Sequence, residues 1–260
     1  YSGTTGGSRS LPALRPTMSV DKNPEFKYGD SEPPVVPEKF TLYEMQCCPF
    51  CQRVRYTLDY HQLPYDRILL DPSAKPGWYP RLNPSAQVPF LLYRTEKLSD
   101  SDVIMKYVDL FKGEEASLLS KCGEEGFKMA MDLASSIATP RYKLCFTKDA
   151  TKEDADALKN ALSKLDQTIK GPYFMGETLS LADLAVFPFL NAWEFVMGRL
   201  LQMDDASGDN VDAIASQWPR VLEYRQLMSK EPCVEQNAFQ EEEFIKFVDD
   251  IVNKKAAAAL

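Results

Sequence analysis

The sequence predicts two domains of different class, an α/β domain over residues 39–113 followed by an all-α domain over residues 119–253. Strand-like and helix-like segments alternate through the first range, whereas apolar residues recur at helical spacing through nearly all of the second. Gly113-Glu114-Glu115 marks a linker between the two. A chain of 260 residues is long enough for two modest domains, so length and pattern agree.

The α/β domain follows a region, residues 1–38, that we interpret as a leader and a proline-rich extended arm. The pattern then predicts a strand at 39–45, a helix at 49–62, a strand at 65–70, a short irregular helix around Trp78, a strand at 88–93, a short strand near Lys97 and Leu98, and a helix from Ser101 to about Phe111. Alternating strand and helix, then a strand pair and a helix, is typical of a thioredoxin-like sheet.

The all-α domain is predicted to contain helices at 119–146, 152–169, from Ser180 onward, at about 217–229 and at 241–253. A break near Pro140 is left open, and Pro188 should kink the helix from Ser180 because proline lacks a backbone N–H. Ser180-Leu181-Ala182-Asp183 is similar to a capping box, which would nucleate that helix. We interpret residues 254–260 as a tail left by an expression vector.

The segment Cys48-Pro49-Phe50-Cys51 carries the clearest chemistry in the chain. It follows a predicted strand and opens a predicted helix, with Pro49 at the first helical position, where its missing N–H costs nothing. The Cys48 sulfur should therefore lie at a helix N-terminus, where the dipole and free N–H groups favour an anion. Because the thiolate is the nucleophile, Cys48 and Cys51 predict thiol–disulfide exchange.

Composition excludes several other classes of function. A net charge of −8 and an isoelectric point near 4.9 argue against a nucleic-acid surface. No run of about 18 apolar residues is present, so no membrane span is expected. Six cysteines are too few for a disulfide scaffold in a chain of this length, which favours a reducing compartment and a cytoplasmic location.

A metal site is not expected. The single histidine, His61, has no partner histidine and should have a capping or surface role at the end of the first helix. Cys47, Cys48 and Cys51 lack a fourth ligand nearby. The three other cysteines should be small core or surface residues; they are Cys122, Cys145 and Cys233.

Two further motifs allow both a structural and a functional interpretation. Val88-Pro89 fits a proline at the start of a strand, but beside a Cys-x-x-Cys segment we favour a cis bond that exposes the Val88 N–H and C=O to an extended peptide. Asp100 or Ser101 fits a helix N-cap. The same pair could hold a zwitterion, with Ser101 and backbone N–H groups on its carboxylate and Asp100 on its ammonium group.

Aromatic residues in the second domain are usually core residues, although some could face the cleft near Cys48. The candidates for contact with a second substrate are Tyr142, Phe146, Phe189 and Trp193.

Residues 1–20 contain no acidic residue and many Ser, Thr and Gly, which fits a transit-peptide remnant or an expression leader that precedes a start at Met18. We favour the leader; a native segment would favour import into an organelle.

These motifs together resemble the cysteine-type cytosolic glutathione transferases of the omega and lambda classes. The matching segments occur in the family's order between about residues 39 and 230, and they are Cys48-Pro49-Phe50-Cys51-Gln52-Arg53-Val54, Lys75-Pro76-Gly77-Trp78-Tyr79, Asn83-Pro84 with Val88-Pro89, Asp100-Ser101, and Gly171-Pro172-Tyr173-Phe174-Met175-Gly176 leading to Ser180-Leu181-Ala182-Asp183. The resemblance implies the glutathione transferase fold, with glutathione as the bound cofactor.

The resemblance also implies roles for individual residues. Cys48 matches the catalytic cysteine that forms a mixed disulfide with glutathione, and Lys75 matches a contact to the glycyl carboxylate. Val88, followed by Pro89, matches the backbone partner of the cysteinyl part. Asp100 and Ser101 match the γ-glutamyl contacts, although the family usually has Glu at the first of these positions. Phe50, within the cysteine motif, is the remaining expected contact.

Cys51 departs from the family pattern, because omega and lambda proteins typically have another residue there. It could attack a disulfide between Cys48 and glutathione and close an internal disulfide. The implied function is glutathione-dependent thiol transfer, in which glutathionylated substrates, small disulfides or dehydroascorbate are reduced. Small hydrophobic substrates also fit, and conjugation to electrophiles should be weak. A homodimer fits omega relatives, and a monomer fits lambda relatives.

Two alternatives of other classes stay open. Intracellular chloride channel proteins share the fold and a Cys-Pro-Phe segment, but their membrane insertion requires an apolar region where this chain has Arg53, Arg55, Asp59, Asp66 and Arg67. The other alternative is a glutathione-dependent ligand carrier with little turnover. The predicted set of glutathione contacts argues against loss of the glutathione site but is compatible with slow chemistry.

Overall fold

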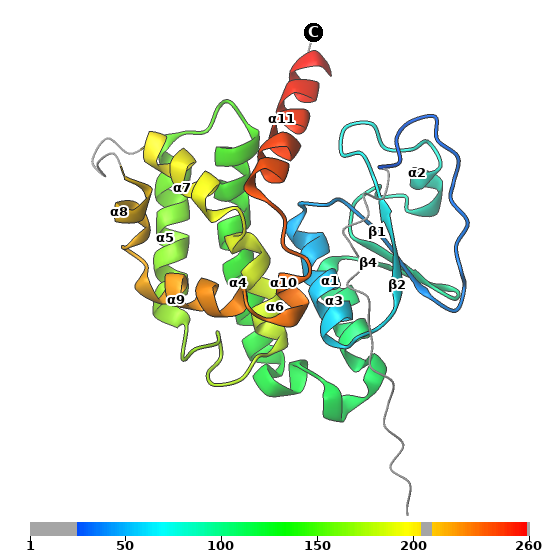
Figure 1. Ribbon diagram of the computed structural model, residues 1–260, viewed down its shortest axis with the longest axis horizontal. Coiled ribbons are helices and arrows are strands. Elements are labelled where there is room, and N and C mark those ends of the chain that lie inside the picture. Colours follow the sequence, from blue (N-terminus) through cyan, green and yellow to red (C-terminus); the bar gives the residue numbers. More distant parts are fainter. Residues whose placement is uncertain (1–24, 204–209, 259–260) are drawn as a thin grey trace, which may run out of the picture.

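The computed structural model describes residues 25–203 and 210–258, which form an N-terminal α/β domain and a C-terminal helical domain (Figure 1). The expected leader at residues 1–20 lies outside the described residues. The N-terminal domain is built on a four-stranded sheet in the order β2-β1-β3-β4. Its strands are β1 (Phe40–Glu44), β2 (Tyr65–Leu69), β3 (Phe90–Tyr93) and β4 (Glu96–Ser99). β1 pairs with β2 in parallel and the other pairs are antiparallel, so the predicted thioredoxin-like sheet is confirmed.

Helices cover both faces of this sheet because alternate residues of β1 point to opposite sides. The helices are α1 (Pro49–Tyr60), α2 (Tyr79–Leu82) and α3 (Ser101–Asp109). The apolar cluster beneath α1 and α3 contains Phe40, Leu42, Val54, Leu58, Leu63, Leu91, Ile104 and Val108. The cluster on the α2 face contains Tyr43, Ile68, Leu70, Trp78, Tyr79 and Phe90.

The C-terminal domain is helical throughout, as predicted. Its α-helices are α4 (Leu119–Phe146), α5 (Lys152–Thr168), α6 (Leu181–Val186), α7 (Trp193–Gln202), α8 (Val211–Ala215), α9 (Pro219–Met228), α10 (Pro232–Glu235) and α11 (Glu241–Ala258). Short 3-10 helices occur at Leu110–Lys112, Glu114–Ala116 and Phe187–Leu190. Helices α8 and α10 were not expected, since they span only five and four residues and are too short to show a helical period.

One helix irregularity was not expected, and another agrees with the prediction. Helix α4 stays helical at Pro140 and kinks at Gly123 instead, where φ is +67°. Glycine adopts this left-handed backbone conformation without a Cβ clash, so the helical path can break at Gly123. Pro188 acts as predicted, because α6 ends at Val186 and the chain tightens into a 3-10 helix. Asp183 accepts hydrogen bonds from the Ser180 N–H and hydroxyl at 2.8 and 2.7 Å, which confirms the capping box.

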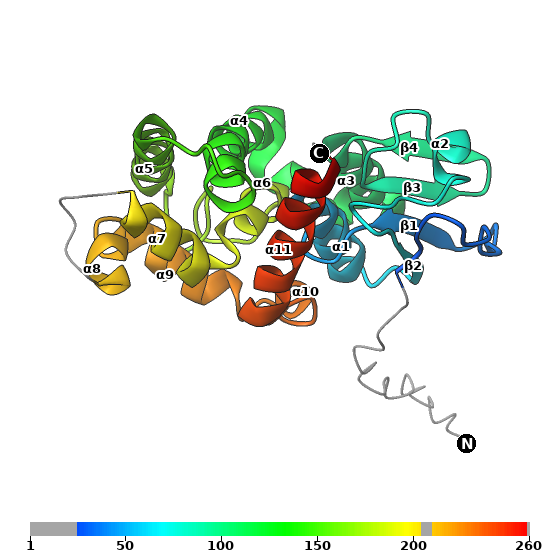
Figure 2. The same ribbon diagram turned by 90° about the horizontal axis from the view of Figure 1, so that it is seen from above.

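Helix α1 lies between the sheet and the helical domain (Figure 2). It is buried from Cys51 to Leu58, so residues on every side of the helix are removed from solvent. One side faces the sheet, while Tyr56 packs into the large apolar core of the helical domain. The first turn of α1 therefore lies where the two domains meet. Among the described residues, no single helix is long and apolar enough to cross a membrane, although the bent pair Leu181–Leu190 and Trp193–Gln202 passes on length and composition.

Candidate active site

Cys48 is the N-cap residue of α1, directly after β1 and a short loop. Its backbone is extended, with φ −73° and ψ 120°, and Pro49 occupies the first turn as predicted. The Cys48 carbonyl accepts the first helical bond from the Gln52 N–H at 3.0 Å. The thiol is half-buried, so it combines access to small molecules with a position at a helix N-terminus.

The surroundings of Cys48 favour its thiolate. A hydrogen bond from the Cys51 thiol, aided by the backbone N–H groups of Cys51 and Phe50 and by the charge of Arg55, lowers the pKa of Cys48 against the opposing effect of burial. Cys51 is fully buried, and burial together with its donated hydrogen bond raises its pKa well above the usual value. The two thiols thus differ, because Cys48 loses its proton more easily and Cys51 keeps its proton as the hydrogen-bond donor.

Cys47 does not share this environment. It is buried in the apolar core, and desolvation raises its pKa to about 12. The thiol consequently stays protonated at neutral pH and is a poor nucleophile. Cys145 and Cys233 are also buried, and Cys122 is half-buried, so these three fit the small structural residues that were expected.

A buried ion pair supports the loop in front of Cys48. Arg55 and Glu44 are both fully buried, and their charged groups lie 3.4 Å apart. The Arg55 guanidinium also donates to the Gln46 carbonyl at 2.8 Å, and Arg67 reaches both the Glu44 carboxylate and the Gln46 side chain. This network fixes the residues that lead from β1 into the cysteine motif and places a cation behind the Cys48 thiolate.

The residues predicted to contact the glycyl and cysteinyl parts of glutathione lie on one side of the N-terminal domain. The Val88–Pro89 peptide bond is cis, as expected, and directly precedes β3. The Lys75 ammonium group donates to the Ala86 carbonyl at 2.6 Å, which brings Lys75 to the loop that carries Val88. The structure thus brings Lys75 close to the Val88 loop, although the two belong to separate sequence motifs.

Asp100 and Ser101 begin α3 on the other side of the cysteine motif. Asp100 is the N-cap residue with φ +67° and ψ 125°, and its side chain makes no capping hydrogen bond. Such a backbone conformation costs on the order of 1–3 kcal/mol for a residue other than glycine. The Ser101 hydroxyl accepts a hydrogen bond from Arg53 at 3.0 Å, so its own proton remains free to be donated.

Arg53 is a site residue that the motif alone did not single out. It is 1% exposed, donates from Nε to the Ala185 carbonyl at 2.8 Å, and lies over the rings of Phe50 and Phe189 at 5.4 and 4.8 Å. Desolvation lowers its pKa to about 10, so it stays charged at neutral pH. Its link to Ser101 spans 48 residues, and no local sequence pattern contains such a contact.

The four candidates for contact with a second substrate lie in two places, with Trp193 apart from both, and only Tyr142 is exposed, since Phe146 and Phe189 are 6% and 3% exposed. Phe189 meets Phe50 edge to face at 5.2 Å, close to the cysteine motif. Tyr142 and Phe146 stack on each other at 5.1 Å on α4, and Phe146 also contacts Phe247 of α11. The structure does not bring Trp193 to either group: it is 4% exposed and packs against Trp218 at 6.3 Å in the helical core.

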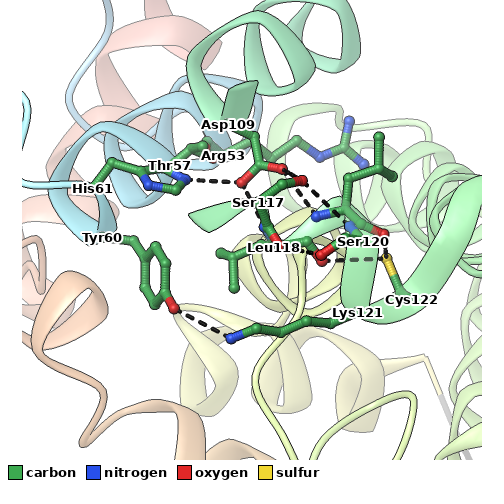
Figure 3. A network of polar contacts seen from close by, with 11 residues as sticks. Arg53, Thr57, Tyr60, His61, Asp109, Ser117, Leu118, Ser120, Lys121 and Cys122 are labelled. Carbon is green, nitrogen blue, oxygen red and sulfur yellow. Dashed lines mark hydrogen bonds and ion pairs between the residues drawn. The ribbon is translucent and has the colours of Figure 1, made fainter. Parts of the chain in front are cut away.

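His61 is buried, which makes the expected surface role wrong, although it does hold the C-cap position of α1. Its Nε2 lies 2.8 Å from Asp109 Oδ1, as Figure 3 shows. Asp109 also accepts hydrogen bonds from the Ser117 hydroxyl at 2.6 Å and from the N–H groups of Leu118 and Leu119, both at 2.9 Å. The network ties the end of α1 to the start of α4. No group of three or more described His, Cys, Asp or Glu residues is arranged to hold a metal ion.

Comparison with known proteins follows the same division of the chain. Residues 47–110 match the family model of the glutathione S-transferase N-terminal domain, and residues 148–227 match that of the C-terminal domain. Glutathione S-transferase L1 of Arabidopsis thaliana is 32% identical over 210 residues, which cover 75% of this chain and 85% of the relative. Glutathione S-transferase L3 of the same organism is 30% identical over 71% of this chain and 80% of the relative.

Other relatives match over a shorter range. Probable glutathione S-transferase DHAR2, chloroplastic, of Oryza sativa subsp. japonica is 33% identical over 58% of this chain, and the chain spans about half of that relative's length, 54%. Among solved structures, glutathione transferase Omega 1C from Trametes versicolor has a TM-score of 0.65 at 24% identity, covering 82% of this chain and 96% of that chain. The predicted fold class is confirmed, and the chain belongs to the glutathione S-transferase family, whose enzymes use glutathione, as the resemblance implied.

Proposed function

We propose that this protein is a glutathione-dependent thioltransferase and reductase in which Cys48 is the nucleophile. The observation that supports this most directly is the division between two adjacent thiols. Cys48 stands at a helix N-terminus with a lowered pKa, and the buried Cys51 thiol donates a hydrogen bond to it. A Ser or Tyr enzyme would hydrogen-bond to the glutathione thiolate, whereas a cysteine thiolate can attack a glutathione disulfide and hold glutathione as a mixed disulfide.

The first half-reaction transfers glutathione to the enzyme. The Cys48 thiolate attacks the glutathione sulfur of a glutathionylated substrate, the substrate sulfur leaves as a thiolate, and Cys48 becomes a mixed disulfide with glutathione. A second glutathione thiolate then attacks the glutathione sulfur of that mixed disulfide. Oxidised glutathione is released and the Cys48 thiolate is restored, so one molecule of reduced glutathione is consumed for each mixed disulfide, whose own glutathione sulfur was already oxidised.

Cys51 offers an alternative second half-reaction. After Cys48 is bonded to glutathione, the Cys51 thiol no longer has a thiolate to donate to, and loss of its proton would let it attack the Cys48 sulfur. The products are a Cys48–Cys51 disulfide and free glutathione, and two further glutathione molecules would be needed to reduce that disulfide. Because Cys51 is fully buried, we favour direct resolution by glutathione.

Glutathione would lie across the first turn of α1. The proposed contacts are Lys75 for the glycyl carboxylate, the Val88 backbone before Pro89 for the cysteinyl part, and Ser101 with Asp100 for the γ-glutamyl end. The arrangement supports this, because Arg53 fixes the Ser101 hydroxyl and Lys75 lies against the Val88 loop. Phe50, with 41% of its surface exposed, would cover the bound peptide.

The acceptors we propose are glutathionylated thiols, small disulfides, dehydroascorbate and small hydrophobic molecules, with the exposed Tyr142 as the candidate side chain that contacts them. Relatives with DHAR in their names support dehydroascorbate as a substrate.

A homodimer is also proposed, supported by the exposed apolar side chains of Val103, Leu110 and Phe111 at α3 and the turn after it. We also propose that the protein acts in the cytoplasm, as the name of one relative says of that relative, while another relative is named chloroplastic.

The test is glutathione-dependent reduction of a glutathionyl mixed disulfide by the wild type, Cys48→Ser, Cys51→Ser and Cys47→Ser. We expect Cys48→Ser to abolish turnover and Cys47→Ser to leave it intact. Retained turnover in Cys51→Ser would indicate the monothiol route, and its loss would indicate the dithiol route. If the wild type binds glutathione without turnover, the catalytic proposal is wrong and a carrier role replaces it.

A further inference from the structure

The proline-rich arm at residues 25–38 crosses the α2 face of the N-terminal domain, and its contacts concentrate on one segment of the chain. At its beginning, the Phe26 N–H donates to the Leu69 carbonyl at 2.8 Å and the Phe26 carbonyl accepts from Asp71 at 2.9 Å. Phe26 and Leu70 thus form a parallel bridge beyond the end of β2. The Tyr28 N–H donates to the Ala74 carbonyl at 2.6 Å, one residue before Lys75.

Side chains of the arm continue the same contact. The Phe26 ring meets Trp78 edge to face at 6.2 Å, and both Phe26 and Val35 pack against the apolar cluster on the α2 face, with which Val88 is also in contact. The far end of the arm is fixed separately, because the Arg94 N–H donates to the Pro37 carbonyl at 2.9 Å and the Arg94 guanidinium pairs with Glu38 at 2.8 Å. The arm is therefore held at both ends.

The segment beneath the arm, residues 71–88, has little regular structure of its own. It contains a single four-residue helix, α2, and otherwise consists of turns and loops. A segment with few internal helical or sheet bonds depends on packing from neighbours to keep one conformation. Prolines 33, 34 and 37 restrict the arm to extended conformations, which lowers the conformational entropy that is lost when the arm docks.

We propose that the arm is a positioning element of the glutathione site: it holds residues 71–88 in place, and with them Lys75 and Val88, so that glutathione meets a preformed surface. The inference rests on the proposed function in one respect, that Lys75 and Val88 contact glutathione. Phe26 is the central positioning residue, because it combines two backbone bonds with the contact to Trp78. Cys48 and α1 lie outside these contacts, so the arm acts on binding and leaves the nucleophile unchanged.

The test compares Phe26→Ala with Phe26→Leu and with Phe239→Ala. Phe239 is a matched control, since it is likewise a partly buried aromatic residue, and it packs in the helical domain against Phe244 and not in the apolar cluster on the α2 face. Three quantities are measured on the full chain: hydrogen exchange of residues 71–88, KM and kcat with glutathione, and the rate at which a small neutral reagent alkylates Cys48.

For Phe26→Ala we expect faster exchange of residues 71–88 and a rise of about tenfold in KM for glutathione, because apparent affinity falls with the fraction of molecules that are competent to bind. We expect kcat and the alkylation rate to stay unchanged, Phe26→Leu to restore most of the affinity, and Phe239→Ala to match the wild type in all three. Unchanged exchange, or an unchanged KM despite faster exchange, would overturn the inference alone. A wild type that does not bind glutathione would overturn the proposed function instead, and with it the role of the arm in binding.

Discussion

Replacement of Asp109 by asparagine should strongly destabilise the protein. Asp109 is 0% exposed, and its carboxylate accepts four hydrogen bonds, two of them from the backbone N–H groups of Leu118 and Leu119 on opposite oxygens. An asparagine amide supplies one acceptor oxygen, so at least one of those backbone groups loses its partner whichever way the amide is turned. The Ser117 hydroxyl and His61 can adapt by accepting, but a backbone N–H cannot.

The size of the effect follows from these contacts. A buried donor without a partner costs about 1–3 kcal/mol, and the remaining bonds lose the strength that a charged acceptor gives them. We therefore expect Asp109→Asn to lower the free energy of unfolding by about 2–4 kcal/mol. For a chain of this length that corresponds to a fall of roughly 5–15 °C in Tm.

The assay is urea unfolding at pH 7, with thermal unfolding as a second measurement. Asp132→Asn is the control, because Asp132 pairs with Lys128 on the surface of α4 and is 66% exposed. An exposed pair of this kind contributes less than about 1 kcal/mol, so the control should stay close to the wild type. If Asp109→Asn changes the free energy of unfolding by no more than Asp132→Asn does, the network in Figure 3 does not stabilise the fold as argued.

The same network has a pH signature. Burial raises the pKa of Asp109, but hydrogen bonds from His61, Ser117 and the N–H groups of Leu119 and Leu118 outweigh it, so the folded-state pKa lies below the usual value. A lowered pKa stabilises the folded state fully above the unfolded-state pKa of about 3.9, and that contribution is lost as the pH falls through the folded-state pKa. The stability gap between the wild type and Asp109→Asn should thus be wide near neutral pH and narrow below about pH 4.

Three further outcomes are expected. Cys51→Ala removes the hydrogen bond to Cys48, so the pKa of Cys48 should rise, which the pH dependence of its alkylation rate would reveal. Ser101→Ala should raise the glutathione dissociation constant about tenfold or more, because a hydrogen bond to a charged group contributes about 1.5–3 kcal/mol; calorimetry that gives an unchanged constant would contradict the Ser101 assignment. Asp183→Ala should lower the free energy of unfolding by about 2–4 kcal/mol, since it removes the capping box and leaves a buried N–H without an acceptor, and urea unfolding measures it.

The features that the sequence predicted correctly are those encoded within a few residues. Pro49 after Cys48 indicates the start of one helix, and Ser180 with Asp183 indicates the start of another, because both signals act within the first turn of a helix. The kink at Gly123 was missed although glycine was visible there, since a single glycine in a helical pattern is often tolerated. Local pattern thus identified most elements of the fold but not all of their irregularities.

Contacts between segments that are distant in the chain could not be predicted from the local sequence pattern. His61 was taken for a capping or surface residue because nothing near it in the chain is its partner, and Asp109 lies 48 residues away. Arg53 and Arg55 were counted as charges that oppose membrane insertion, yet both are buried and held by hydrogen bonds or an ion pair from other elements. Burial of a charge depends on which groups the fold brings to it, so spacing alone cannot predict it.

The placement of α1 ties the proposed active site to both domains. Three side chains of α1 form hydrogen bonds with the helical domain. Arg53 donates to the Ala185 carbonyl at 2.8 Å, and Asn191 donates to Gln52 and to Tyr56, both at 3.0 Å. These bonds are buried or partly buried beside apolar contacts such as that of Tyr56 with the helical core, so separating the domains would replace the bonds by bonds to water and would expose that apolar surface. The helix that carries Cys48 therefore cannot shift without breaking contacts on both of its sides. Cys48, as the nucleophile we propose, would gain a fixed position from this arrangement toward glutathione on one domain and a second substrate on the other.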